Sequence, residues 1–244
     1  MKIAIIGHGK MGREVEKVAL SRGHEIVCII DCDNRDDFQS EAFRSADVAI
    51  EFSVPVAGMS NVLASFAENV PVVSGTTGWL DEATAAEIEQ LCAGGATLLH
   101  ATNFSLGVNV TMAANRLLAR LLAPYPEYHA SLEEVHHIHK LDHPSGTAIT
   151  LSEQLVSANE RYCSWAETDI PAPGVLPVRA LREGEVPGIH TVTWTSPDDS
   201  ITLRHEAKSR HGFAVGAVVA AEWLAKAPRG HRYSMADVLG LSDI

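Results

Sequence analysis

Short apolar runs alternate with amphipathic stretches along the first part of the chain. Strands are predicted at Lys2–Ile6, Glu25–Ile30, Asp47–Phe52, Val70–Ser74 and Thr97–Ala101, and helices at Met11–Ser21 and Asp81–Cys92. The strand segments are short and apolar, as buried strands are, whereas the helical segments carry apolar residues at helical spacing. This alternation predicts a doubly wound parallel sheet of the α/β class.

The alternation ends near Phe104, where we place a crossing into a second domain. Beyond it the sequence predicts a helix at Val108–Leu122, a strand at Ser131–His139, a helix at Thr147–Ser157, an irregular region at Arg161–Pro187 and an antiparallel hairpin of Thr191–Thr195 and Ile201–His205. Polar residues alternate on the hairpin strands, which predicts a face that is exposed or covered by a partner. Phe213–Ala225 has the Ala- and Val-rich composition of a helix on a parallel sheet, so we expect a return to the first domain.

Composition excludes several classes of protein. The chain has 244 residues, 46% hydrophobic and 20% charged, enough for one large or two modest globular domains. A net charge of −12 disfavours nucleic acid or an anionic membrane as the main partner. No stretch has the pattern of a signal peptide or the ~20 apolar residues of a membrane span. The four cysteines lack disulfide-framework or zinc-like spacing, which favours reduced thiols and a cytoplasmic location.

A glycine-rich turn follows the first predicted strand and opens the first predicted helix. Its sequence fits G-x-G-x-x-G, in which backbone approaches a pyrophosphate at a helix N-terminus. Asp31 ends the second strand, where its carboxylate would accept hydrogen bonds from ribose hydroxyls. The alternative is a tight structural turn with an incidental acid. We expect a dinucleotide site of Gly7, His8, Gly9, Lys10, Met11, Gly12 and Asp31.

The residues after Asp31 bear on the choice of cofactor. A 2′-phosphate requires a basic residue beside the ribose, whereas Asp31 is followed by Cys32-Asp33-Asn34. The sequence therefore favours NADH. NADPH stays open, because Arg35 or Lys10 could reach a phosphate.

Two further turns end later strands of the predicted sheet. Ligands bind at the carboxyl ends of the strands in an open α/β sheet. We therefore expect the cofactor also to contact Gly75, Thr76, Thr77, Ala101, Thr102, Asn103 and Phe104. Ordinary strand-to-helix turn chemistry is the alternative.

Histidines and a lysine gather just before a Pro-Ser-Gly-Thr sequence that is typical of a helix start. Cations beside a helix N-terminus suit a small substrate that carries carboxylates and needs a proton. On a strand, His136 and Lys140 share one face, and His137 points the other way unless the strand ends or bends there. His136 and Lys140 are therefore candidates for joint work at a substrate.

The predicted helix start completes the candidate substrate site. Ser145, Gly146 and Thr147 stand where an N-cap and first-turn amides could bind a carboxylate, and Arg210 could add a cation at the domain crossing. Simple capping and a structural arginine are the alternatives. The spacing of the four histidines fits neither a helical pair nor a set with cysteines, so we expect no metal.

Several motifs together resemble the dihydrodipicolinate reductases (4-hydroxy-tetrahydrodipicolinate reductases) of bacterial lysine and diaminopimelate biosynthesis. In the family's terms they are Gly7-x-Gly-x-x-Gly12, Gly75-Thr-Thr-Gly78, Asn103-Phe-Ser-x-Gly-Val-Asn109, Glu134-x-His-His-x-x-Lys-x-Asp-x-Pro-Ser-Gly-Thr-Ala148 and Pro187-Gly-x-His190. The resemblance implies a Rossmann-like dinucleotide-binding domain at 1–106 and 211–244. It also implies an α+β substrate-binding domain at 107–210, whose open mixed sheet builds a homotetramer.

The resemblance further implies an NAD(P)H-dependent reduction of 4-hydroxy-tetrahydrodipicolinate to tetrahydrodipicolinate. Hydride would pass from the nicotinamide to the ring of a cyclic imine, with His136 as the acid/base residue and Lys140 as the proton donor. His137, Gly146 and Thr147 match substrate-binding positions, next to Ser145. The glycine turn, Asp31 and the two later turns match cofactor positions.

The chain departs from the family pattern near the cofactor. Its first glycine turn is shorter than the common GxxGxxG form, and Cys32 stands where many relatives carry a basic residue, which bears against NADPH. Two other functions are alternatives: a nicotinamide-dependent dehydrogenase of a small amino or keto acid, and a non-catalytic nicotinamide-sensing protein. A sensor would need neither His136 nor Lys140, so the presence of both favours an enzyme.

Overall fold

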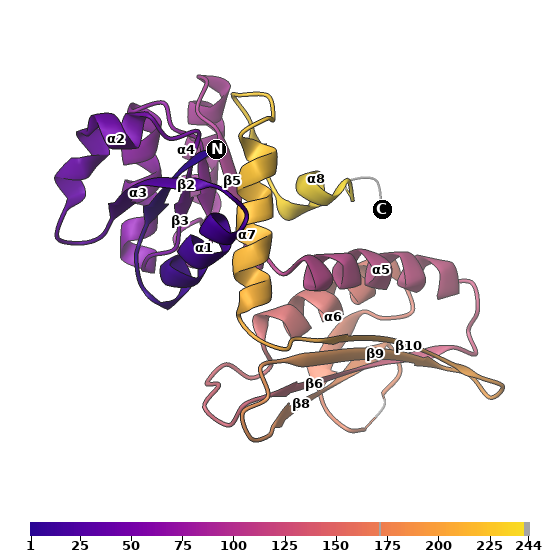
Figure 1. The fold of residues 1–244 in the computed structure, drawn as a ribbon. Helices are drawn as coiled ribbons and strands as arrows, with labels where there is room; N and C mark the ends of the chain where they lie inside the picture. The colour runs from indigo at the N-terminus through magenta and orange to yellow at the C-terminus, as the bar shows by residue number, and fades with distance from the viewer. Residues whose placement is uncertain (171, 242–244) are drawn as a thin grey trace. The chain divides into compact units, whose positions relative to one another are not determined.

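The chain folds into two compact units in the computed structural model, which describes residues 1–170 and 172–241. The first unit comprises Met1–Leu106 together with the segment that begins at His211, and the second comprises Gly107–Arg210 (Figure 1). Each unit has its own sheet and its own hydrophobic core. The chain therefore leaves the first unit once and returns to it.

A parallel six-stranded sheet forms the centre of the first unit, with the strand order β11-β5-β4-β3-β1-β2. Its strands are β1 (Lys2–Ile6), β2 (Glu25–Ile30), β3 (Val48–Glu51), β4 (Val72–Ser74), β5 (Leu98–His100) and β11 (Arg232–Tyr233). The central strands are apolar up to their last residues, because helices cover both faces; β3, β4 and β5 end on Glu51, Ser74 and His100. The chain adds β2 on one side of β1 and then crosses to add β3 on the other side, so the direction of winding reverses between the neighbouring strands β1 and β3. Open α/β sheets bind ligands at such a point.

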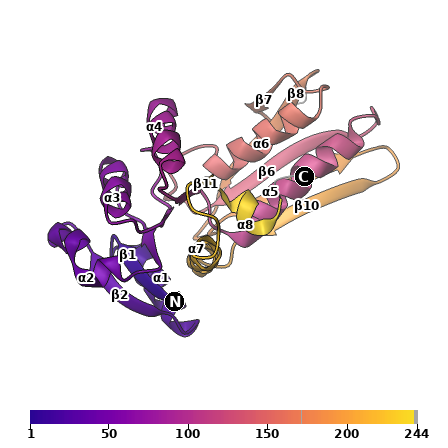
Figure 2. The same cartoon turned by 90° about the horizontal axis from the view of Figure 1, so that it is seen from above.

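Helices form a layer on each face of this sheet. They are α1 (Lys10–Ser21), α2 (Glu41–Arg44), α3 (Pro55–Ala67), α4 (Glu82–Ala93), α7 (His211–Leu224) and α8 (Met235–Leu239), with a short 3-10 helix η1 (Arg35–Gln39) before α2. One core lies between the sheet and α1, α7 and α8, and the other between the sheet and α2, α3 and α4 (Figure 2). A Cβ at Gly216 would lie 1.7 Å from the Phe104 carbonyl oxygen, so α7 packs directly against the backbone of Phe104.

The second unit is a five-stranded mixed sheet with helices on one face (Figure 1). Its elements are α5 (Leu106–Leu122), β6 (His129–His136), α6 (Gly146–Ala158), β7 (Ser164–Glu167), β8 (Val175–Arg182), β9 (Ile189–Thr195) and β10 (Ser200–Glu206). The strand order is β10-β9-β6-β8-β7, with β6 antiparallel to β9 and parallel to β8. Leu132 and Trp194 are buried against α5 and α6, whereas the alternate residues Ser131 and Thr193 line the other face.

The predicted fold class is confirmed, and most predicted elements agree with the structure within a few residues. Two predictions are wrong. The strand predicted at Ser131–His139 ends at His136, because the following backbone turns and Lys140 N–H donates to the His137 carbonyl. The region Arg161–Pro187, predicted to be irregular, contains β7 and β8. The helix α3 was not predicted, and the acidic connection predicted between β2 and β3 contains η1 and α2.

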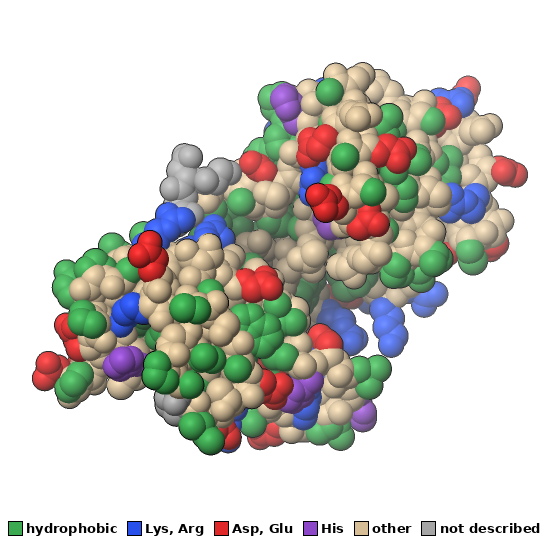
Figure 3. Space-filling model, turned by 180° about the vertical axis from the view of Figure 1, so that it is seen from behind, with side chains coloured by type: hydrophobic (Ala, Val, Ile, Leu, Met, Phe, Trp, Pro, Cys, Tyr) green, Lys and Arg blue, Asp and Glu red, His purple; other side chains and the backbone are tan. Residues whose placement is uncertain are grey.

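The surface agrees with the acidic composition. Figure 3 shows several acidic side chains close together on the first unit, as expected for a net charge of −12. Across the described ranges, no helix combines the length and apolar character that a bilayer crossing needs.

Candidate active site

The turn between β1 and α1 packs tightly at two glycines and is open at the third. A Cβ at Gly7 would lie 2.1 Å from the Phe52 carbonyl oxygen, and one at Gly12 would lie 2.0 Å from that of Gly7. A Cβ at Gly9 would meet no atom within 4 Å. Gly9 is the N-cap of α1, which has no side-chain cap and no acidic residue in its first turn. The turn therefore presents an uncapped helix N-terminus to solvent, as a pyrophosphate requires.

Asp31 and Arg35 follow β2 at the same edge of the sheet. The His8 backbone N–H donates to Asp31 Oδ2 at 3.3 Å, so the carboxylate lies beside the glycine turn. Arg35 Nη1 donates to Asn61 Oδ1 at 2.6 Å. Arg35, which the sequence left open as a partner for a 2′-phosphate, is therefore bound to α3. Lys10 is exposed at the start of α1.

The turns after β4 and β5 expose some of the predicted cofactor residues and bury others. The Thr76 hydroxyl donates to Glu51 Oε1 at 2.7 Å and accepts from the Ser53 N–H at 2.8 Å, so this buried side chain is committed to the protein. Thr77 and Thr102 are exposed, and Phe104 is buried. Met11, Gly75, Ala101 and Asn103 are half-buried. Only part of the predicted set can thus offer side chains to a ligand.

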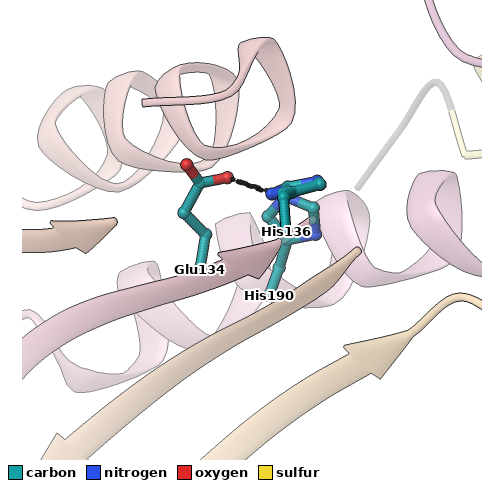
Figure 4. A group of neighbouring side chains, drawn as sticks. All are labelled: Glu134, His136 and His190. Atoms are coloured by element: carbon teal, nitrogen blue, oxygen red, sulfur yellow. Dashed lines mark ion pairs between the residues drawn. The ribbon is translucent and has the colours of Figure 1, made fainter. Parts of the chain in front are cut away.

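Glu134, His136 and His190 form a buried cluster on the helix-covered face of the second sheet (Figure 4). Glu134 and His136 are two residues apart on β6 and so share a face, and the register pairs Glu134 with His190 of β9. His136 Nδ1 lies 2.8 Å from Glu134 Oε2, and His190 Nε2 lies 3.7 Å from the same oxygen. The 2.8 Å contact is not aligned as a hydrogen bond and forms an ion pair when His136 is protonated.

The second oxygen of Glu134 binds two other groups. The Ser145 backbone N–H donates to Oε1 at 2.9 Å, and Arg182 Nη1 donates to it at 3.2 Å. Burial raises the pKa of Glu134, but the contacts from His136 and Ser145 outweigh it and bring the pKa to about 2. The carboxylate is therefore ionised at neutral pH and orients His136 with Nδ1 toward it.

His190 forms a neutral wall of the cluster. Burial, and after it the charge of His136, lowers the pKa of His190 to about 4. Its Nε2 lies 3.1 Å from Ser145 Oγ, while its buried Nδ1 has no hydrogen-bond partner in the described part of the chain. When the proton is on Nε2, the unpartnered Nδ1 is an acceptor and no buried N–H donor is left without a partner. The tautomer protonated on Nε2 is therefore favoured.

Gly188 lies against the opposite edge of the His136 ring. A Cβ at Gly188 would lie 2.9 Å from His136 Nε2, and its φ of +154° is one that side chains rarely adopt. The loop backbone therefore approaches Nε2 as only glycine allows. Because Nδ1 faces Glu134, Nε2 is the ring atom available for proton exchange with a substrate.

Lys140 lies in the turn after β6 and not on a strand. Its Nζ pairs with Asp142 Oδ1 at 2.7 Å. The expectation that strand geometry puts Lys140 on one face with His136 is thus wrong, because the strand ends first. Lys140 nevertheless lies close enough for its charge to lower the pKa of His190, although burial is the main cause of that shift.

The other histidines of the motif differ in their surroundings. His139 pairs with Glu185 at 3.0 Å and His143 with Glu167 at 2.8 Å, both at exposed positions outside the cluster. His137 is half-buried just beyond the end of β6, so its orientation is set by the turn and not by strand alternation.

The predicted substrate residues at the helix start lie beside the cluster, and in the described part of the chain Arg210 makes no hydrogen bond or ion pair with Glu134. Ser145 caps α6 by accepting from the Ala148 N–H at 3.2 Å, with Gly146 exposed and Thr147 half-buried in the first turn. Arg210 stands in an exposed turn before α7. Within the described ranges, it is not one of the residues that contact Glu134.

The cluster also has the residue types of a metal site, since its ligand atoms lie within 4.8 Å of one another. Arg182, however, already balances the charge of Glu134 and shares Oε1 with the Ser145 N–H. A divalent ion would stand next to this guanidinium, at a Coulombic cost. The arrangement suits proton transfer better than metal binding.

Sequence reasoning assigned no role to Glu134, His190 or Arg182. The position of Glu134 two residues before His136 was a usable signal, because strand geometry puts both on one face. His190 stood in a quoted motif without a role. Arg182 lay in the region predicted to be irregular, where no pattern singled it out.

Models of one protein family match nearly the whole chain. A family model described as the dihydrodipicolinate reductase N-terminus matches residues 1–104, and one described as the C-terminus matches residues 107–239. The 4-hydroxy-tetrahydrodipicolinate reductase of Christiangramia forsetii is 45% identical over 229 residues, which cover 92% of each chain. That of Archaeoglobus fulgidus is 34% identical over 266 residues, covering 98% of this chain and 100% of the relative.

Solved structures share the fold. A dipicolinate-bound dihydrodipicolinate reductase from Paenisporosarcina sp. TG-14 has a TM-score of 0.76 at 21% identity, covering 96% of this chain and 97% of that one. An amine dehydrogenase from Mycobacterium smegmatis has a TM-score of 0.61 at 13% identity, covering 94% of each chain. Both carry the two-part architecture described above at low sequence identity.

Proposed function

The chain belongs to the dihydrodipicolinate reductase family, and we propose that it reduces 4-hydroxy-tetrahydrodipicolinate to tetrahydrodipicolinate in lysine and diaminopimelate biosynthesis. The observation that carries the proposal is the buried ion pair of Glu134 and His136 beside a capped helix start, in a chain that both halves of the family match. This pair gives the chain a histidine whose proton can be exchanged near a site for carboxylates.

A bound nicotinamide would supply the hydride. The residues that fit the dinucleotide are those of the glycine turn, with Asp31 for the ribose and the turns after β4 and β5 beside them. Gly7 and Gly12 pack against carbonyl oxygens, while Gly9 leaves the N-terminus of α1 open to the pyrophosphate. Thr76 contributes through its backbone, because its hydroxyl is bound within the protein.

His136 is the acid/base residue of the reduction. Glu134 is ionised and holds Nδ1, so Nε2 is the acid/base atom that exchanges protons with solvent. Lys140, held by Asp142 near the cluster, donates the one proton that the reduction consumes with the hydride and balances negative charge on the substrate. His137, Ser145, Gly146 and Thr147 line the place for the substrate carboxylates, and Arg210 adds a cation from the end of the unit.

NADH is the preferred cofactor in this proposal. Asp31 accepts a hydrogen bond from the glycine turn and would repel a 2′-phosphate, and Arg35 is bound to Asn61. Measured kcat/KM should therefore be higher with NADH than with NADPH. A clearly higher value with NADPH contradicts this preference and leaves the reductase activity itself untouched.

The chain is further proposed to act as a homotetramer in the cytoplasm. The uncovered face of the second sheet carries polar residues that include Ser131, Glu133, Arg179 and Thr191, which suits contact with a second copy. The four cysteines are free, as expected in a reducing compartment. Light scattering of the purified protein tests the tetramer.

A substrate panel tests the proposed reaction. Oxidation of NADH at 340 nm is followed with the freshly made product of dihydrodipicolinate synthase, and separately with small keto acids with and without ammonium; reduction of NAD+ is followed with small amino acids. Turnover with the synthase product alone supports the proposal. Turnover only with an amino or keto acid identifies another dehydrogenase, and NADH binding without any turnover identifies a sensor.

A further inference from the structure

A second buried carboxylate, Glu51, ends β3 in the first unit and takes no part in the proton chemistry above. It is fully buried and accepts hydrogen bonds from the last residue of β4 and from the turns that follow β3 and β4. Ser74 Oγ donates to Oε2 at 2.7 Å, and Thr76 Oγ1 donates to Oε1 at 2.7 Å. Oε1 also accepts from the Ser53 N–H at 3.1 Å and from the Ser53 hydroxyl.

All these donors are neutral, and in the described part of the chain Glu51 has no ion-pair partner. A buried charge without a cation is costly unless several hydrogen bonds satisfy it. A glutamate that holds Ser53, Ser74 and Thr76 at once therefore fixes their positions relative to one another. Two of the three, Ser53 and Thr76, lie in turns and not in strands.

These two turns lie at the edge of the sheet where the cofactor is expected. Phe52, next to Glu51, brings its carbonyl oxygen to the place where a Cβ on Gly7 would lie. Its ring fills the corresponding place at Gly75, where a Cβ would lie 2.1 Å from Cε1. The glycine turn and the turn after β4 thus both pack on Phe52, and Glu51 holds the residues on each side of that contact.

A further contact extends the network toward the residues after β2. The buried Asn61 donates from Nδ2 to Ser53 Oγ at 3.0 Å and lies 3.5 Å from Glu51 Oε1. Its Oδ1 accepts from Arg35 at 2.6 Å. The carboxylate therefore orients the amide that binds Arg35.

We propose that Glu51 is a positioning residue for the nicotinamide cofactor, acting through the turns at Ser53 and Thr76. This inference rests on the cofactor binding proposed above. Glu51 touches neither cofactor nor substrate, and its loss weakens NADH binding because the two turns no longer hold the glycine turn and Phe52 in register.

The test measures the dissociation constant of NADH by its fluorescence, without substrate, in folded protein. Glu51→Gln keeps the shape but turns an NH2 group toward hydrogen-bond donors, so NADH binding should weaken at least about tenfold. Ser74→Ala removes one buried hydroxyl that donates to Glu51, at a residue outside the proposed cofactor set, and should weaken binding in the same direction. This variant decides the question if Glu51→Gln does not fold.

Ser65→Ala is the matched control. Ser65 is also fully buried and on α3, but its hydroxyl donates to the Asn61 carbonyl and does not contact Glu51. It should lower thermal stability slightly and leave the NADH dissociation constant within about twofold of the original chain.

The outcomes separate this inference from the proposed function. Weaker NADH binding in Glu51→Gln and Ser74→Ala, with unchanged binding in Ser65→Ala, supports a positioning role. Lower melting temperatures with unchanged NADH binding in the folded variants overturn it, because Glu51 is then only structural. No NADH binding by the original chain contradicts the proposed cofactor and, with it, this inference.

Discussion

Glu51 and Glu134 are both fully buried carboxylates near the end of a strand, one in each unit, yet their surroundings differ in charge. Glu51 accepts from hydroxyls and amides, whereas Glu134 contacts two imidazoles and a guanidinium. The donors to Glu51 cannot take up or release a proton in the physiological range, so these hydrogen bonds hold the backbone and exchange no protons. The second contains imidazoles, which can exchange them.

The groups that contact the carboxylate distinguish scaffolding from proton chemistry in these two buried networks. Burial and the number of hydrogen bonds are similar at the two glutamates, but among the residues that the structure describes Glu134 contacts titratable side chains and Glu51 does not. Changes around Glu134 should therefore alter turnover and pH dependence, and changes around Glu51 should alter cofactor binding.

The largest effect is expected when the histidine beside Glu134 is replaced. His136→Gln removes the ring whose Nε2 exchanges the proton, and kcat should fall by roughly 10²- to 10⁴-fold. The NADH dissociation constant should stay the same, because His136 is proposed to act on the substrate and is not among the residues proposed for the dinucleotide. His139→Gln, at an exposed histidine three residues on, is the control. Full turnover in His136→Gln would leave the Glu134 cluster without its assigned role.

A pH-dependent stability should be visible through His190, and in the same direction through His100, which lies beside the Thr76 carbonyl and whose pKa is lowered by burial. The pKa of His190 is about 4 in the folded chain against an ordinary 6.5, so below about pH 6.5 the unfolded chain binds a proton that the folded chain does not. This contribution to stability is complete above pH 6.5 and is lost as the pH falls to 4, about 3 kcal/mol in total.

Urea denaturation of His190→Asn measures that contribution. Its free energy of unfolding should depend less steeply on pH between 6.5 and 4 than that of the original chain. The loss expected from Glu134, whose pKa is about 2, belongs to the lower window between 4.5 and 2 and should remain. Equal slopes for both proteins between pH 6.5 and 4 would show that His190 is not held neutral by burial.

Neutralising Glu134 should slow turnover less than losing His136. Glu134→Gln keeps the shape but removes the charge that holds His136 Nδ1, at a cost of about 1.5–3 kcal/mol, or roughly 10- to 150-fold in kcat. Glu133→Gln is the matched control, because Glu133 is the preceding residue of β6, is half-buried and pairs with Arg179 on the other face. A similar loss in both variants would argue for a general disturbance of the strand.

The smallest effect is expected at the glycine beside His136. Gly188→Ala places a methyl group near Nε2 and should lower kcat by roughly three- to tenfold. Gly184→Ala is the control, since Gly184 also has a positive φ but a Cβ there would meet no atom within 4 Å. If both variants lose activity alike, backbone strain and not contact with His136 is the cause.

Much of the fold could be predicted because its elements follow simple periodicities. Buried parallel strands such as Lys2–Ile6 are apolar runs, and the hairpin of β9 and β10 alternates. The helix α3 escaped prediction because its exposed residues include the apolar Val56 while it buries the polar Asn61 and Ser65, which inverts the usual pattern. The strand β8 was not predicted because it contains Pro177, and a proline argues against a central strand. The pairing of β8 with β6 begins one residue later, at Val178.

The site was harder to predict, because its networks join residues far apart in sequence. The motif around His136 and the glycine turn were visible as spacing. The contacts of Glu134 with Arg182 and His190, and of Glu51 with Thr76, depend on strand register and on the path of loops that no local pattern reports. The end of β6 at His136 also removed the shared strand face expected for Lys140.

A double-mutant cycle on kcat tests directly whether Glu134 acts on turnover through His136. Oxidation of NADH with the synthase product is measured for the original chain, Glu134→Gln, His136→Gln and the double variant. We predict that Glu134→Gln costs about threefold or less once His136 is already replaced, because the interaction it supports is gone. A further loss as large as the one that Glu134→Gln causes alone would contradict the account.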